Sequence, residues 1–273
     1  MRVEQNLGNK KLGIIICADD FGISSQVNNA IIKLLELKKI SAVSCLVTGK
    51  GWHDGANLLR SFRDEVDIGL HLSYCESSFN KALRLAYLGR LDREKIFSGF
   101  KTQLNCFFKE LGRFPDFIDG HQHIHQLPII RLALMDLISI MRVDKIYVRN
   151  SSISLNDIFS RKISILKNIL IAIPGNSLKR YLSKMHIYTN NDFLGIYDYD
   201  VNNNPEEIFE TFLKTAKHPN SILMIHPSCG NERDDNKNSC FDNKRKEEMR
   251  YFDSDKYKNI LEEYGLYLTR FIY

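Results

Sequence analysis

Short apolar runs alternate with longer stretches of helical periodicity along most of the chain. The first run, Leu12 to Ala18, has no polar interruption, which is typical of a parallel strand buried on both faces. From about Gln26 to Lys38 apolar residues recur at helical spacing, and this pattern predicts an amphipathic helix. The repeated order of strand and helix indicates βαβ units around a largely parallel sheet.

The same patterns predict the remaining elements. Further strands are expected at Ala42–Val47, Val66–Leu72, Phe117–Asp119, Lys145–Val148, Ile222–Ile225 and Leu266–Ile272. The last of these is expected to close the sheet near its start. Further helices are expected near Asp54–Phe62, Glu94–Leu111, Ile129–Met141, Asn156–Ile171, Pro205–Lys217 and Lys244–Tyr264. No repeat or linker divides the 273 residues, so we expect one α/β barrel domain spanning 1–273.

Composition narrows the classes of partner. The net charge of +5 comes from 38 basic and 33 acidic residues that are scattered along the chain, whereas a nucleic-acid binder concentrates its basic residues on one face. No window approaches the roughly 20 apolar residues of a membrane span. The six cysteines form no C-x-x-C pair, and the first eleven residues are polar. These features predict a cytoplasmic protein.

Candidate chemical groups follow the ends of the predicted strands. In a parallel α/β barrel these carboxyl ends share one rim, where active sites are built. The residues at these positions are Asp19, Asp20, His71, Asp119, His121, His123, His125, Arg149 and His226. Residues that are distant in sequence are therefore expected to meet in one pocket.

A mixed set of Asp and His is suited to a divalent metal with an open coordination position. We assign Asp20, His71 and His121 as ligands, a number that leaves room for water at a hydrolytic site. Imidazole and carboxylate suit Zn, Mn, Fe, Co or Ni, whereas Mg prefers oxygen ligands. Asp19, pointing away from Asp20, is the candidate general base, and His226 the candidate acid for the leaving amine.

Each assignment has a structural alternative. The Asp19–Asp20 pair could form a turn, His71 could be a core histidine, and His226 before Pro227 could only terminate a strand. Arg149 could be a surface arginine, although at this rim it would hold Asp19 ionised.

The three histidines after the fourth strand are harder to explain structurally. With a period of two, His121, His123 and His125 would share a face. At least one is expected to be a metal ligand, and His123 and His125 are expected to bind substrate or to support the ligands. His53, His186 and His218 lack such a setting and are expected to be surface or structural residues.

Four motifs together resemble the YdjC-like carbohydrate deacetylases, which include chitooligosaccharide deacetylases. They are Ala18-Asp19-Asp20-Phe21-Gly22, Gly69-Leu70-His71-Leu72, the run from Asp119 to His125, and Ile225-His226-Pro227. The resemblance implies an irregular TIM-like (β/α) barrel related to polysaccharide deacetylases. It also implies one divalent metal, usually magnesium, held at Asp20, His71 and His121, with Asp19 as base and His226 as acid.

The implied reaction is hydrolysis of the acetamido group of an N-acetylated sugar, either an oligosaccharide or a glycolipid, to acetate and an amino sugar. Two alternatives remain open at this point. One is a metallohydrolase of another class, a phosphoesterase or an amidohydrolase. The other is a relative that binds sugar or lipid without turnover.

The sequence does not assign a role to two segments. The first, residues 151–192, carries nothing that matches chitooligosaccharide recognition, and the second is Pro227–Lys244. Residues 151–192 include a stretch, Phe159–Tyr188, that mixes Ile and Leu with Lys and Arg, as a peripheral membrane surface would. Two ordinary helices with solvated charges would give the same pattern. The polar segment Pro227–Lys244 is expected to be a long loop, either a lid or a mobile excursion. A homodimer is a further expectation for a barrel of this size.

Overall fold

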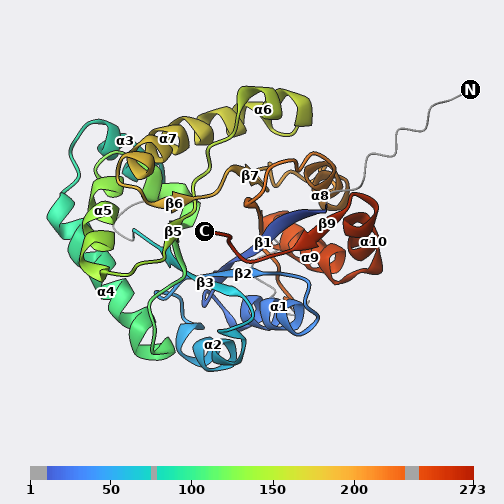
Figure 1. Ribbon diagram of the computed structural model, residues 1–273, viewed down its shortest axis with the longest axis horizontal. Helices are drawn as coiled ribbons and strands as arrows, with labels where there is room; N and C mark the ends of the chain where they lie inside the picture. Colours follow the sequence, from blue (N-terminus) through green and yellow to red (C-terminus); the bar gives the residue numbers. More distant parts are fainter. Residues whose placement is uncertain (1–10, 75–78, 231–239) are drawn as a thin grey trace, which may run out of the picture.

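A curved sheet of parallel strands forms the centre of the protein (Figure 1). The computed structural model describes residues 11–74, 79–230 and 240–273, so most of the polar N-terminal segment lies outside the described residues. Along the sheet the order is β6-β5-β4-β3-β2-β1-β8-β7, and β9 pairs with the first part of β1. The strands are β1 (Leu12–Phe21), β2 (Ala42–Cys45), β3 (Asp67–Leu72), β4 (Phe117–Gly120), β5 (Tyr147–Val148), β6 (Tyr188–Thr189), β7 (Asp192–Leu194), β8 (Ser221–Ile225) and β9 (Leu266–Leu268).

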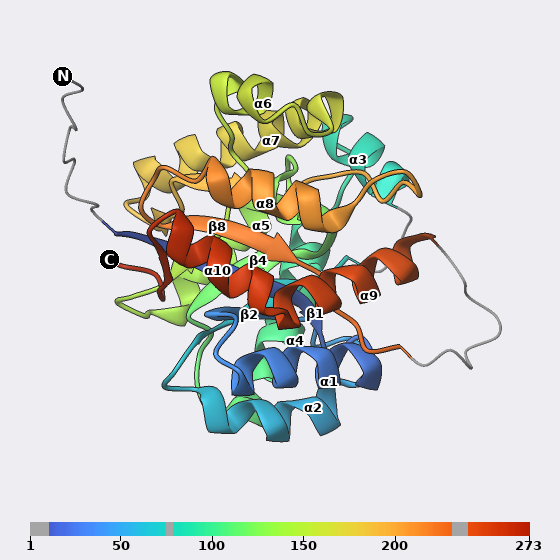
Figure 2. The same ribbon diagram turned by 90° about the vertical axis from the view of Figure 1, so that its right-hand side faces the viewer.

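Helices cover the outside of this sheet. Figure 2 shows α1 and α2 on one side of the strands, α6 and α7 on the opposite side, and α8, α9 and α10 in front. They are α1 (Ser25–Glu36), α2 (Trp52–Leu59), α3 (Phe79–Tyr87), α4 (Arg93–Leu111), α5 (Ile130–Met141), α6 (Leu155–Arg161), α7 (Ile165–Lys184), α8 (Pro205–Lys214), α9 (Cys240–Asp253) and α10 (Asp255–Glu263), with 3-10 helices η1 (Arg60–Phe62) and η2 (His121–Gln126).

The barrel is open between β6 and β7. These strands are consecutive in sequence, yet within the described residues each pairs only with its other neighbour, β5 or β8. Every described strand pairing is parallel. The predicted α/β fold with mostly parallel strands is therefore confirmed, and the C-terminal strand does close the sheet beside β1.

The first βαβ unit illustrates how the sequence builds the core. All of β1 beyond Leu12 is buried, as its apolar run predicts. Helix α1 begins where the Ser24 side chain accepts a hydrogen bond from the Val27 amide, which satisfies one of the free donors of the first turn. Its buried stripe includes Ile31 and Leu34, and complete burial of each contributes about 1.5–3 kcal/mol.

Three predicted elements differ from the structure. The helix expected at 156–171 is two helices, α6 and α7, because Lys162 and Ser164 adopt positive φ between them. The helix expected at 244–264 also divides in two, since the Ser254 side chain caps α10. The loop expected to reach Lys244 is wrong at its end because α9 already begins at Cys240; residues 231–239 lie outside the described part.

Candidate metal and catalytic site

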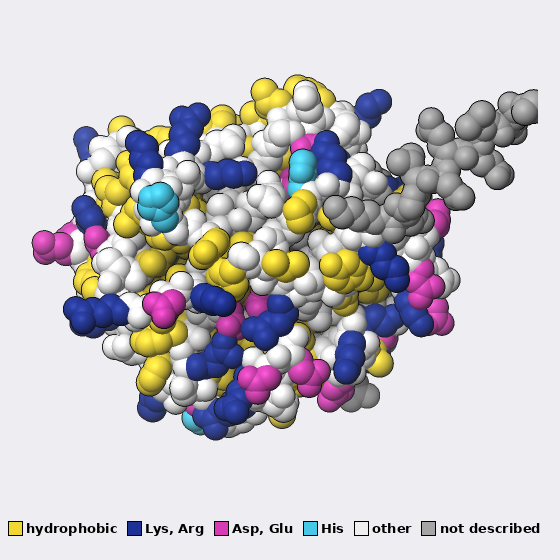
Figure 3. Space-filling model, viewed as in Figure 1, with side chains coloured by type: hydrophobic (Ala, Val, Ile, Leu, Met, Phe, Trp, Pro, Cys, Tyr) yellow, Lys and Arg dark blue, Asp and Glu magenta, His cyan; other side chains and the backbone are white. Residues whose placement is uncertain are grey.

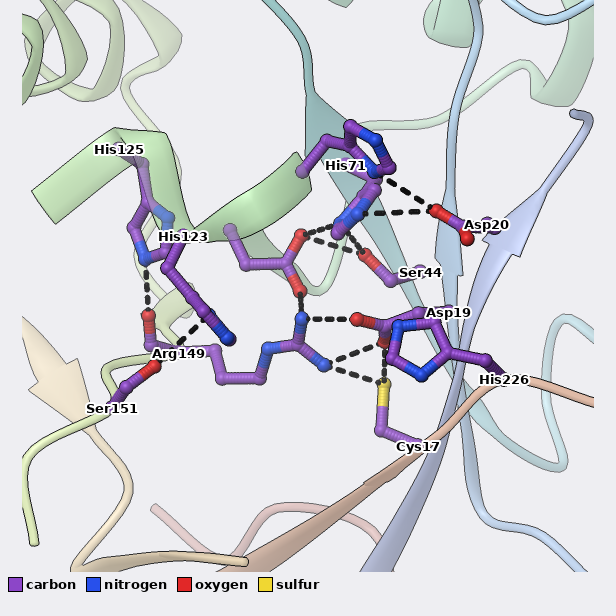
Figure 4. A network of polar contacts seen from close by, with 12 residues as sticks. Cys17, Asp19, Asp20, Ser44, His71, His123, His125, Arg149, Ser151 and His226 are labelled. Carbon is purple, nitrogen blue, oxygen red and sulfur yellow. Dashed lines mark hydrogen bonds and ion pairs between the residues drawn. The ribbon is translucent and has the colours of Figure 1, made fainter. Parts of the chain in front are cut away.

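The two adjacent aspartates lie at an irregularity near the carboxyl end of β1. The register of β1 against β2 shifts between Ala18 and Phe21, and Asp20 adopts a φ of 67°. A non-glycine residue in this region costs about 1–3 kcal/mol and persists where its surroundings hold it. The result is that Asp19 and Asp20 contact different partners, as Figure 4 shows.

Asp20 faces two histidines from neighbouring elements. Its Oδ1 lies 3.1 Å from Nδ1 of His121, at the start of η2, and 3.6 Å from Nε2 of His71, near the end of β3. The ligand atoms of the three residues all lie within 4.8 Å of one another. Asp20 and His71 are buried, whereas the His121 side chain is 36% exposed, so this group is open on one side only.

A hydrogen-bond chain behind His71 determines which ring nitrogen faces Asp20. Nδ1 of His71 donates to Oδ1 of Asp119 at 2.7 Å, and the Ser44 hydroxyl donates to the same oxygen at 2.6 Å. Nε2 is thereby left free toward Asp20. A carboxylate behind a histidine in this way orients metal-ligating imidazoles and raises their basicity.

The electrostatics of this group favour a cation. Burial alone would lower the pKa of His71, but the charges of Asp119, Asp19 and Asp20 and the hydrogen bond that His71 donates to Asp119 raise it overall. The pKa of Asp20 is lowered despite its burial by the His121 hydrogen bond and by Arg245. The residues present thus fit a divalent metal, by donor chemistry and by their excess negative potential.

Asp19 forms a buried ion pair with Arg149. The two guanidinium nitrogens Nη1 and Nη2 each lie 2.6 Å from a different carboxylate oxygen of Asp19, and Nη2 also lies 2.7 Å from Asp119. All three side chains are at most 1% exposed. Their carboxylates raise the pKa of Arg149 even though burial opposes this. A second cluster of potential ligands, Asp19, His71 and Asp119, is therefore already occupied by this cation.

The prediction that His121, His123 and His125 share a face is wrong. Gln122 and His123 adopt positive φ (53° and 60°) in the 3-10 helix η2, so the segment is not extended and its three histidines contact different partners. Figure 4 shows His123 directed toward Ser151 and His125 toward the Arg149 backbone. Nδ1 of His123 lies 3.0 Å from the Ser151 hydroxyl, and Nε2 of buried His125 donates to the Arg149 carbonyl at 2.7 Å. Burial lowers the pKa of both, that of His125 to about 4.

His226 follows β8 on the other side of the cavity. The Tyr199 hydroxyl lies 2.8 Å from its Nδ1, and donation from this hydroxyl would place the proton of the neutral ring on Nε2. Burial lowers the pKa of His226 to about 4, although Asp20 and Asp19 oppose this. Beneath it the backbone amide of His226 donates to Glu248, whose other oxygen accepts from Tyr197 at 2.6 Å.

Sequence reasoning missed three residues of this site. Arg245 on α9 contacts Oδ2 of Asp20 at 3.0 Å, and its buried Nε and Nη2 have no hydrogen-bond partner among the described residues. Tyr199 and Ser44 support His226 and Asp119. Each lies in a segment with no motif, and only the fold brings it to the rim. His53 and His186 are exposed and His218 is partly exposed, as expected.

A cavity of about 1010 Å³ joins these groups to the surface. On one side it is lined by Asp19, Asp20, His71, His121, His123, His226 and Arg245. On the other side it is lined mainly by apolar residues of α3 and α7. The site is thus a deep polar end with an apolar approach. Among the helices of the described residues, none is both long enough and apolar enough to cross a membrane.

Fold and site together define an open barrel of parallel strands with a cluster of candidate metal ligands, Asp20, His71 and His121, at its carboxyl rim. The family model described as YdjC-like protein matches residues 13–263. The chain therefore belongs to the YdjC-like family, and the resemblance noted in the motifs is confirmed.

The relatives with curated names are similar over part of their length. Human carbohydrate deacetylase is 30% identical over 143 residues, which are 45% of this chain and 44% of that protein. Chitooligosaccharide deacetylase of Serratia marcescens is 30% identical over 132 residues, 43% of this chain and 52% of that protein. The chain thus spans about half the length of the curated relatives it matches.

Solved structures support the fold over nearly the whole chain. An Enterococcus faecalis protein named for a proposed role in cellobiose-phosphate cleavage superposes with a TM-score of 0.69 at 19% identity, covering 95% of this chain and 97% of that one. A peptidoglycan N-acetylglucosamine deacetylase superposes with a TM-score of 0.51 at 12% identity, covering 96% and 87%. The relation of the fold to polysaccharide deacetylases is therefore confirmed.

Proposed function

We propose that the protein is a metal-dependent hydrolase that removes the acetyl group from an N-acetylated sugar. The observation that carries this proposal is the divided role of the adjacent aspartates. Asp20 faces His71 and His121, while Asp19 is held by Arg149 at the floor of the same cavity. The deacetylase names of the relatives support the same reaction.

Asp20, His71 and His121 would hold the metal. When bound, a divalent ion supplies Lewis-acid polarisation of the scissile carbonyl. Two imidazoles and one carboxylate favour a transition metal over magnesium, so we expect zinc or another transition metal to bind more tightly than Mg²⁺. Metal content after reconstitution with equimolar Zn²⁺ and Mg²⁺ tests this expectation, and a preference for Mg²⁺ would contradict it.

We assign proton transfer to Asp19 and His226. Asp19 takes the proton of the attacking water at its carboxylate, which Arg149 fixes in place by two hydrogen bonds. His226 is neutral in the resting site because burial lowers its pKa to about 4. Its Nε2 proton is directed by the Tyr199 hydroxyl on Nδ1, and we assign it the later transfer to the leaving amine.

Arg245 and His123 complete the cavity. Arg245 lines the cavity, and its buried Nε and Nη2 have no hydrogen-bond partner among the described residues. These two nitrogens are therefore suited to donate to an oxygen of the acetyl group. His123 also lines the cavity. We assign it to substrate contact, and His125 to support of the Arg149 backbone.

Acetate release tests the proposed reaction directly. Metal-reconstituted protein would be incubated with N-acetylglucosamine oligomers and acetylated glycolipids, beside Asp20→Ala and His121→Ala. The exposed His53→Ala on α2 serves as the control. Acetate formation that disappears together with bound metal in the first two variants, and persists in the control, supports the proposal. A protein that binds no metal contradicts it.

The competing hydrolase classes are less consistent with this geometry. Two-metal phosphoesterases need ligands for a second ion, whereas here both carboxylates of the second cluster contact Arg149. Hydrolysis of nitrophenyl phosphate in the absence of any acetate release would reverse this ranking. Tight binding of an acetylated sugar with no turnover under any metal would favour a binding protein.

A further inference from the structure

The outer wall of the cavity is made of apolar side chains that are exposed to solvent. On α7, Leu166, Leu170 and Ile173 are 71%, 60% and 57% exposed, and on α3 Tyr87 is 56% exposed. All four line the same cavity as Asp20. A contiguous apolar surface beside a binding site marks a place where an apolar group is bound. We call these four residues the apolar wall.

The spacing and charge of α7 define the character of this wall. Positions 166, 170 and 173 lie on one face of the helix, because residues three and four apart are neighbours. The helix also carries Lys167, Lys179, Arg180 and Lys184 and no acidic residue. Figure 3 shows Lys and Arg side chains beside hydrophobic ones over α6 and α7. This combination suits a ligand with an apolar part and an anionic part.

The apolar wall is poorly suited to further sugar rings. A sugar residue presents hydroxyl groups that need hydrogen-bond partners when they leave water. On the α7 side of the cavity the charged lining residues are Lys167 and Asp198, which lie 3.5 Å apart as an ion pair, and Nζ of Lys167 also donates to the Tyr197 carbonyl at 2.6 Å. An oligosaccharide in this position would lose hydration without compensation, whereas an alkyl chain would gain from burial.

We propose that the substrate is a lipid-linked sugar, in which an N-acetylated sugar enters the polar end while its apolar aglycone lies along the apolar wall. The inference rests on the proposed deacetylase function and specifies its substrate class. We favour a substrate chain over a second protein copy because the wall is continuous with the cavity that contains Asp20, His71 and His121.

Matched glycosides test the proposal. Methyl and octyl N-acetylglucosaminides, used below the micelle concentration, present the same acetamido group with and without a chain. Burial of two methylene groups corresponds to about a tenfold gain. We therefore expect kcat/KM and affinity by calorimetry to favour the octyl glycoside at least about tenfold. Equal values for the two, or a preference for a chitooligosaccharide over the octyl glycoside, would overturn the inference.

A pair of exposed variants locates the effect. Leu166→Ser with Leu170→Ser should abolish the octyl preference, so that the octyl and methyl glycosides give equal kcat/KM and equal affinity. Leu155→Ser with Phe159→Ser on α6 removes side chains of similar exposure (60% and 55%) that do not line the cavity, and should retain the preference. An octyl preference that survives in the first variant contradicts the proposed location.

Two controls separate the remaining outcomes. If neither glycoside is deacetylated by metal-loaded protein, the proposed reaction fails, while the calorimetric comparison still decides the lipid inference. A second outcome is that the two glycosides bind equally and the protein binds anionic phospholipid vesicles. If Leu166→Ser with Leu170→Ser abolishes this vesicle binding, membrane docking would replace the lipid-linked substrate. A dimer that this variant dissociates, again with equal glycoside binding, would replace it with an interface between copies.

Discussion

Removal of the Arg149 charge should destabilise the protein strongly. In Arg149→Ala, Asp19 and Asp119 remain at most 1% exposed and lose their shared cation. Deleting one partner of a buried ion pair costs about 3–5 kcal/mol, because the remaining charge has neither water nor a counter-ion. The matched control is Arg93→Ala. Its bidentate pair with Asp136 has similar distances but side chains 49% and 36% exposed, and such pairs contribute about 0–1 kcal/mol.

The pH dependence provides a second test of the same reasoning. Although burial raises the pKa of Asp119, the charge of Arg149 and the contacts with His71 hold it below its ordinary value. The stabilisation that results is present above the ordinary pKa of a carboxyl group and is lost as the pH falls through the folded value. Without Arg149, burial dominates and the Asp119 carboxyl protonates more readily. The difference from wild type should therefore shrink as the pH is lowered from 8 to 5.

Urea unfolding with a chelator present measures both effects without interference from metal. The linear extrapolation gives the free energy of unfolding for wild type, Arg149→Ala and Arg93→Ala at each pH. If Arg149→Ala costs no more than Arg93→Ala, or if its cost does not change with pH, the cluster is not a buried charge network and the assignment of Asp19 loses its basis.

Three further predictions concern the supporting residues. Tyr199→Phe removes the hydroxyl that contacts Nδ1 of His226. Loss of a hydrogen bond of about 1 kcal/mol predicts about a fivefold fall in kcat with little change in KM. An unchanged kcat would exclude this role. Burial raises the pKa of Glu248 from 4.5 to about 7. Glu248 therefore adds to the free energy of unfolding below its unfolded pKa, and this contribution is lost as the pH rises toward 7. Wild type should therefore lose stability relative to Glu248→Gln across that interval in urea titrations, and parallel pH curves would contradict the shift. Gly69→Ala should lower the unfolding free energy by about 1–3 kcal/mol, because a Cβ there would lie 2.3 Å from the Phe117 ring. Gly99→Ala, in exposed helix with no atom within 4 Å, should raise it by about 0.5–1 kcal/mol; equal effects would show that packing at Gly69 is not the cause.

The strands that carry the chemistry could be predicted from sequence because their apolar runs are buried on both faces. β1, β3 and β8 end beside Asp19, His71 and His226 as expected. β6 and β7 have two and three residues, which is too short for any periodicity to appear. Their position depends on tertiary pairing rather than on local pattern.

Local rules failed where tertiary contacts override them. The expected helix ended before Pro174, which lies inside α7, since proline usually disrupts a helix interior. Conversely, the break at Lys162–Ser164 has no glycine or proline to mark it. At the site, the spacing of His121, His123 and His125 could not reveal the positive φ of Gln122. Arg245 could not be assigned because its helix carries no motif of its own and only the fold brings it to the rim.

The open edge between β6 and β7 leaves the segment that carries α7 at one end of the sheet, where it can change separately from the inner strands. Asp19, Asp20, His71 and His121 follow β1, β3 and β4, within the continuously paired part of the sheet. The α7 residues of the apolar wall belong to the segment between β5 and β6. A segment beside an open edge can be lengthened, shortened or exchanged without breaking a strand ladder. Chimeras that replace residues 151–187 between family members should thus exchange substrate preference and retain the hydrolytic apparatus, which would let one barrel diversify by recombination.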